Sequence, residues 1–77
     1  MKISIRSALM SDKIKELFDG NVFNGVRYEY LEKQGIELLF TVSGDDIEAL
    51  DLVALTKNTI KSTNYGKGLY FSVTEKP

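Results

Sequence analysis

The sequence of 77 residues contains neither cysteine nor histidine. Without cysteine there is no disulfide and no thiolate metal site. Without histidine, the remaining metal ligands are carboxylate and carbonyl oxygens, which suit hard ions rather than zinc. Nucleophilic catalysis also lacks its usual base, and no motif indicates the alternative Ser–Lys pair. We therefore expect no metal, no cofactor and no enzymatic activity.

Long apolar runs and an excess of one charge are also missing. No run approaches the roughly 18 to 20 apolar residues of a membrane span, and the segment from Met1 to Arg6 lacks the apolar core of a signal peptide. Ten basic and eleven acidic residues leave a net charge of −1. Nucleic-acid affinity comes largely from neutralising phosphates, so this balance disfavours it. We expect a cytoplasmic protein without a membrane partner.

The composition is that of a small globular protein, with 43% hydrophobic and 10% aromatic residues. Residues 1–77 are too few for more than one α+β domain. A chain this short buries a smaller share of its surface than a larger domain does. The core must therefore be tightly packed, or a second copy must cover part of it.

The segment from Gly25 to Ser43 predicts a hairpin with a tight connection at Lys33–Gly35. Side chains in a strand alternate between two faces, so this pattern predicts one covered and one wetter face. The covered face would hold Val26, Tyr28 and Tyr30 from the first strand, and Ile36, Leu38, Phe40 and Val42 from the second. The wetter face would hold Arg27, Glu29 and Leu31, and Glu37, Leu39, Thr41 and Ser43. The tyrosine pair is better explained as a strand face closing over a helix than as a ligand groove.

Alternation over Lys2–Arg6 predicts a first strand, and apolar spacing then becomes helical. The helix can start at Ser7 or Ser11, and we favour Ser11 with Met10 packing ahead of it as a staple. Its apolar stripe is Met10, Ile14, Leu17 and Phe18. Gly20 and the following asparagine end it. An apolar pair at 22–23 and an Asn–Gly turn then reverse the chain.

A second helix is predicted from Asp46 to about Thr56, where Asp45 and Glu48 form a capping-box-like arrangement. The residues on its packed side would be Ile47, Leu50, Val53 and Ala54, with Leu52 and Leu55 pointing away. The segment Lys57–Thr63 is ambiguous between a continued helix, which we favour, and a Thr-rich edge strand.

Leu69–Thr74 predicts the last strand, with Leu69, Phe71 and Val73 inward, Tyr70 outward, and Glu75–Pro77 as a frayed end. The resulting order is strand-helix-strand-strand-helix-strand. Two such split units predict an α+β ferredoxin-like fold, which is a four-stranded antiparallel sheet with both helices on one face.

Two short segments carry residues that could serve chemistry. Asp45, Asp46, Glu48 and Asp51 could hold Mg²⁺ or Ca²⁺, but acidic charge at a helix start explains them without an ion. The glycine-bearing segment around Lys67 has neither the spacing nor the following helix of a phosphate loop. It partly overlaps an RNA-recognition strand, but the central strands lack an outward aromatic residue for base stacking.

Two functions follow as hypotheses. The first is a non-catalytic interaction module that forms a homodimer or binds a protein partner through the open sheet face or an edge strand. Its contact residues would be apolar side chains outside the core: Leu31, Leu39 and Tyr70, with Leu52 and Leu55 on the helix. The alternative is a domain that binds nucleic acid or a small anionic ligand through Arg6, Arg27 and Lys67.

Overall fold

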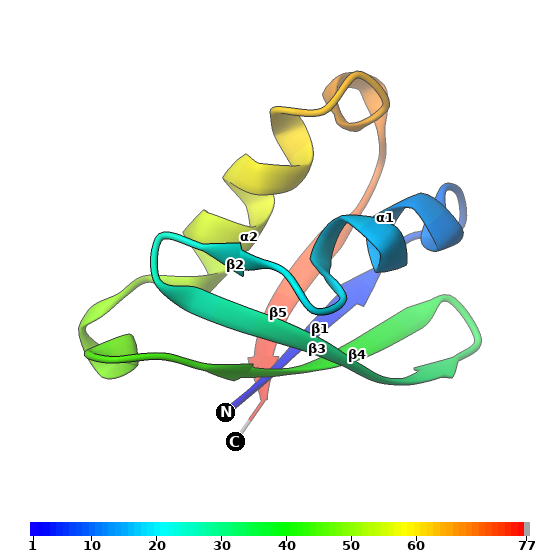
Figure 1. Cartoon of the computed structure of the whole chain (residues 1–77). Helices are drawn as coiled ribbons and strands as arrows, with labels where there is room; N and C mark the ends of the chain where they lie inside the picture. Colours follow the sequence, from blue (N-terminus) through cyan, green and yellow to red (C-terminus); the bar gives the residue numbers. More distant parts are fainter. Residues whose placement is uncertain (77) are drawn as a thin grey trace.

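Alternating strands and two short amphipathic helices build an α+β fold, described here by a computed structural model of residues 1–76 (Figure 1). The elements are β1 (Lys2–Arg6), α1 (Ser11–Phe18), β2 (Val22–Phe23), β3 (Val26–Gln34), β4 (Glu37–Ser43), α2 (Leu52–Lys61) and β5 (Ser72–Lys76). Short 3₁₀ turns, η1 (Ile47–Ala49) and η2 (Gly66–Gly68), flank α2.

All five strands form one antiparallel sheet in the order β2-β3-β4-β1-β5. In its register Arg6, the last residue of β1, lies opposite Glu37 on β4 and Ser72 on β5. The end of β1, the tip of the β3–β4 hairpin and the start of β5 therefore meet at one end of the sheet. The backbone N–H of Ser7 donates to the carbonyl of Ile36 there at 3.0 Å.

Tyr28 shows that both helices cover the same face of the sheet. Its ring lies 4.6 Å from the Phe18 ring of α1, and its hydroxyl is 2.8 Å from the Thr56 hydroxyl of α2. Figure 1 shows both helices on the same side of the sheet. The buried core comprises Ile3, Ile5, Ile14, Phe18, Val26, Tyr28, Leu38, Phe40, Val42, Leu52, Ile60 and Val73. The residues predicted for the covered face of the hairpin therefore lie in the core, with two exceptions: Ile36 at the hairpin tip is exposed, and Tyr30 is half-buried.

Over residues 1–76 the sheet has five strands rather than the expected four, because the apolar pair before the Asn–Gly turn also forms ladder pairs. Asn24 and Gly25 have φ of 50° and 79°, which is the left-handed backbone that the tightest hairpin turns require. The turn places Val22 opposite Arg27, so a two-residue strand adds to the edge of β3. A second irregularity, a β-bulge at Leu31, shifts the β3–β4 register.

The start and the buried side of the second helix were predicted wrongly. Asp46 adopts a left-handed φ of 56°, and Leu50 is extended, so only a 3₁₀ turn forms before Asp51. The Asp51 carboxylate accepts a hydrogen bond from the Ala54 N–H and caps α2. This start buries Leu52, Thr56 and Ile60. Leu52 is only 1% exposed, and Leu55 is half-buried against the core, so neither is a free contact residue.

The favoured helical continuation is confirmed as far as Lys61, where α2 ends. The start of α1 at Ser11 is also confirmed, but Met10 precedes it with a left-handed φ of 64° and is exposed. The last strand starts at Ser72 rather than Leu69 and continues through Lys76, so Glu75 and Lys76 are not a frayed end. Pro77 lies outside the described residues.

Candidate functional site: the groove beside the β5 edge

The two edges of the sheet differ in how their backbone groups are satisfied. On the β3 side, the Tyr28 N–H donates to the Asn21 carbonyl at 3.0 Å, and the Tyr28 carbonyl accepts from the Gly20 N–H at 2.8 Å. The Tyr30 N–H donates to the Asp19 carboxylate at 3.0 Å. Together with β2 and the bulge at Leu31, these bonds block that edge against a further strand.

The β5 edge has no such protection. Within residues 1–76, β5 pairs with β1 alone, and its residues make no backbone hydrogen bond outside that ladder. An unpaired strand edge presents a row of N–H and C=O groups that can pair with another extended chain. β5 is therefore the edge at which the sheet can be extended.

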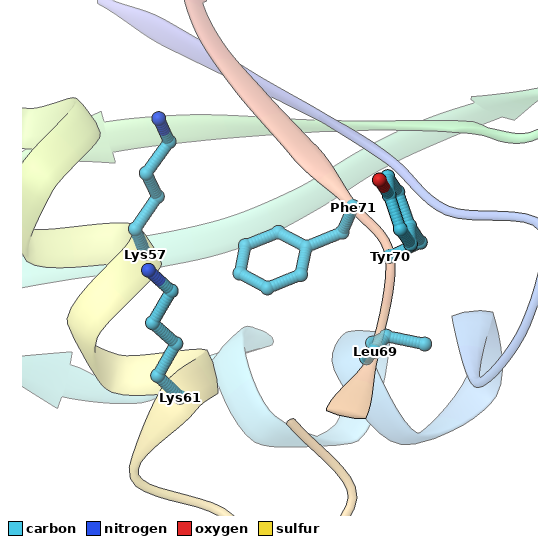
Figure 2. A pocket seen from close by; sticks show the side chains of 5 residues that line it. All are labelled: Lys57, Lys61, Leu69, Tyr70 and Phe71. Carbon is cyan, nitrogen blue, oxygen red and sulfur yellow. The ribbon is translucent and has the colours of Figure 1, made fainter. Parts of the chain in front are cut away.

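A hollow of about 220 Å³ lies beside this edge, between the end of α2 and the chain leading into β5. Its lining residues are Lys57, Lys61, Leu69, Tyr70 and Phe71, which together with the free edge of β5 we call the β5 edge groove. Figure 2 shows the Phe71 ring pointing toward the two lysines, whereas Tyr70 lies on the other side of the backbone. Tyr70 is 97% exposed.

The helical period explains why the lysines face this groove. Thr56 and Ile60 are buried one turn apart, so Lys57 and Lys61, each one residue later, lie together on the adjacent flank. That flank is directed toward the start of β5, where both side chains line the hollow with Phe71.

Gly66 fixes the return of the chain from α2 to β5. Its N–H donates to the Thr63 hydroxyl at 2.9 Å, and a Cβ at this position would clash with the Ile60 carbonyl oxygen. Only glycine lets the 3₁₀ turn η2 approach the end of α2 this closely. The turn thereby sets the position of Tyr70 and Phe71 relative to the lysines.

The lysines give the groove a positive charge. Among the described residues, the ion pairs join Arg6 and Lys76 to Glu37, and Arg27 to Glu29. Neither Lys57 nor Lys61 takes part in one. Two neighbouring cations are thus available to an anionic side chain that enters beside β5.

A second hollow, of about 480 Å³, lies on the other side of the same chain segment. Its lining residues are Arg6, Ser7, Ala8, Ile36, Tyr70, Phe71 and Ser72. Ile36 at the hairpin tip is 53% exposed, so this side presents apolar surface next to Tyr70. Tyr70 and Phe71 therefore belong to two adjoining hollows, one bordered by lysines and one largely apolar.

The centre of the open sheet face is occupied by a polar network. The Ser4 hydroxyl donates to the Glu37 carboxylate at 2.7 Å, and Arg6 and Lys76 each approach the same carboxylate at 3.5 Å. The hydrogen bond from Ser4 lowers the pKa of Glu37; the two cations lower it further, while desolvation opposes them. The groups satisfy one another, which leaves little for a partner at this face.

The other residues predicted for a binding site are not brought together. Arg6 and Arg27 lie at opposite ends of β4, because Arg6 pairs with Glu37 and Arg27 with Ser43. Leu39 is only 8% exposed, whereas Leu31 at the bulge is 46% exposed. Lys67 lies in the η2 turn, one turn of chain before Tyr70.

Lys57, Lys61 and Phe71 were not predicted as site residues. The available signal was the four-residue spacing of the lysines, which places them on one flank of any helix that includes both. That spacing was not decisive because the segment Lys57–Thr63 had two interpretations, and a strand would have placed the lysines differently.

Two observations limit the kinds of site that the described residues can form. No helix among them is long and apolar enough to cross a membrane. No group of three or more acidic side chains within residues 1–76 is arranged to hold a metal ion, and Asp51 of the acidic cluster serves as the cap of α2. Comparisons with protein families, with curated proteins and with solved structures found no match to this chain.

Proposed function

We propose that the chain is a non-catalytic interaction module that binds a protein partner by pairing an extended segment of it with the β5 edge. The observation that carries this proposal is the difference between the two sheet edges. The β3 edge is closed by β2, by three hydrogen bonds and by a bulge. Within residues 1–76, β5 pairs with β1 on one side only, so its outer edge is unpaired, and exposed Tyr70 borders it. A partner strand gains main-chain hydrogen bonds there without displacing any existing ones.

The ferredoxin-like arrangement forms part of the same proposal. It is supported by the strand order, in which β1 lies between β4 and β5, and β4 lies between β3 and β1. Helix α1 connects β1 toward β3, and α2 connects β4 to β5, as two interleaved units of that fold require. In this arrangement β2 is an addition to the edge of β3.

The sheet edge is a better contact surface than the open sheet face for two reasons. Leu39 is almost fully covered, and Glu37 is held by one hydroxyl and two cations. Docking a partner there would require desolvation of charges that are already paired, which costs free energy. The edge groove instead offers unpaired backbone, an exposed aromatic ring and free lysines.

A selection from displayed random nine-residue peptides tests the proposal without requiring the identity of the partner. Selected peptides are titrated into the ¹⁵N-labelled protein, and the amide shifts are mapped. We expect shifts over residues 70–76, and a loss of binding in Tyr70→Ser. Leu31→Ser, which also replaces an exposed apolar side chain, is the matched control and should bind normally. Shifts confined to the open sheet face, or no selected binder, would refute the proposed edge binding.

A further inference from the structure

We infer the chemical class of the partner: an extended peptide segment with acidic side chains at alternate positions and apolar side chains between them. This inference rests on the proposed function, because it assumes that the segment adds to β5. It follows from three features of the β5 edge groove, namely the alternation of faces, the spacing of the lysines and the distribution of charge.

The alternation of β5 separates two kinds of surface. Val73 is buried under the helices, and Phe71, two residues earlier, packs on the same side against the core. Tyr70 lies on the other side of the backbone from Phe71 (Figure 2). Side chains of an added strand alternate in the same way. Every second side chain of the partner therefore faces α2 and its lysines, and the intervening ones face Tyr70.

The spacing of Lys57 and Lys61 matches that of a strand. Four residues of an α-helix rise about 6.0 Å, whereas same-face residues of a strand are about 6.7 Å apart. Two lysines one helical turn apart can therefore each meet one of two successive helix-facing side chains of an added strand. An acid-x-acid sequence is the pattern that places a carboxylate at both positions.

The surrounding charges fix where the acidic positions lie. Glu75 is on the same side of β5 as Phe71 and Val73, toward the end of the strand. Lys76 faces the other side, where it pairs with Glu37. An acidic side chain beside Glu75 would be repelled, so the acidic pair belongs at the Phe71 end of the groove, next to the lysines.

A titration with two matched peptides tests the inference. The probes are acetylated nine-residue peptides of alternating valine and glutamate, or of alternating valine and lysine, added to the ¹⁵N-labelled protein. We expect the glutamate peptide to shift amides of residues 70–73 and to bind about tenfold more tightly than the lysine peptide. This difference should shrink with added salt, because exposed charges are screened.

Charge reversal on the protein provides the second arm. K57E/K61E should bind the lysine peptide about tenfold more tightly than the glutamate peptide. The control variant K13E/K33E reverses two exposed lysines outside the groove and so changes the net charge by the same amount. It should still bind the glutamate peptide more tightly than the lysine peptide. Equal binding of both peptides, or an unchanged preference in K57E/K61E, would overturn the inference.

Failure of this inference is distinguishable from failure of the proposed function. If displayed peptides without alternating acids bind at β5, the edge still binds partners and only the acidic pattern is wrong. If dilution of the protein alone shifts the β5 amides, the occupant of the edge is a second copy of the chain. In that case the inferred acidic partner is wrong, but the proposed binding at the β5 edge stands. If no ligand shifts β5, both proposals fail.

Discussion

Removal of the Tyr28 hydroxyl tests how α2 is held on the sheet. Tyr28 and Thr56 are both fully buried, and their hydroxyl oxygens lie 2.8 Å apart. Tyr28→Phe keeps the ring in contact with Phe18, at 4.6 Å between ring centres, and with Phe40, at 6.5 Å. The substitution therefore changes the hydrogen bond with little change in core volume.

The expected cost follows from the partner left behind. In Tyr28→Phe the Thr56 hydroxyl stays buried without a partner, which costs about 1 to 3 kcal/mol in the free energy of unfolding. In a domain of this size, each kcal/mol lowers Tm by about 4 to 8 °C. Thr56→Val should cost a similar amount, because it leaves the Tyr28 hydroxyl buried without a hydrogen-bond partner instead. In the double variant neither hydroxyl remains, so its loss should be smaller than the sum of the single losses.

Urea unfolding of the wild type, the two single variants and the double variant measures the coupling between these side chains. We expect a coupling free energy of about 1 to 2 kcal/mol. Burial raises the pKa of Tyr28 while the Thr56 hydroxyl lowers it, so Thr56→Val should raise that pKa further, as read by absorbance. Strictly additive losses, with an unchanged titration, would refute the buried contact between β3 and α2.

Three further variants test other parts of the fold. Gly66→Ala should cost about 2 to 3 kcal/mol in urea unfolding, because its Cβ would meet the Ile60 carbonyl, whereas Gly68→Ala, in open space, should be nearly neutral. Asp51→Ala should cost about 1 kcal/mol by loss of the α2 cap, and unchanged stability would contradict that role. Folding lowers the pKa of Glu37 below its ordinary 4.5, so the stability it contributes is complete above 4.5 and is lost as the pH falls toward the lowered value. The unfolding free energy of Glu37→Gln should therefore depend less on pH in this acidic range, and a pH dependence equal to that of the wild type would contradict the network.

The sequence predicted the α+β class and most of the covered face of the central hairpin because strand alternation is a strong local signal. It did not predict that Glu37 and Leu39, assigned to the wetter face, would be buried, or that Ile36 would be exposed. Leu38, Phe40 and Val42 lie in the core as their spacing requires, and Tyr28 lies opposite Val42 on the same face. Residues 22–23 were too few to show a periodicity. Whether they join the sheet depends on the turn at Asn24, which brings them beside β3.

The start of the second helix was mispredicted because two acidic residues compete for the cap. Asp45 has the sequence pattern of a capping box, but Asp51 forms the observed cap. The choice moves the buried stripe from Ile47 and Leu50 to Leu52, Thr56 and Ile60. Where the helix starts depends on which apolar stripe packs best against the sheet. That packing includes the hydrogen bond between the Tyr28 and Thr56 hydroxyls, which local sequence does not encode.

The candidate site was predicted only in part. Tyr70 was identified as an outward aromatic residue, and an edge strand was among the contact surfaces considered. The lysines of the groove come from α2, and their position depends on the close approach of Gly66 to the end of that helix. A contact between segments that meet only through such a turn has no periodic signature in the sequence.

A spin label on the valine–glutamate peptide tests edge binding most directly. Paramagnetic broadening of the amide signals reports where the peptide lies along the sheet. We predict broadening that is strongest at residues 70–76 and falls across β1 and β4 to its weakest at β3, in the order of the strands in the sheet. Broadening centred on Leu39 and Thr41 of the open face, or along the edge of β3, would contradict the account.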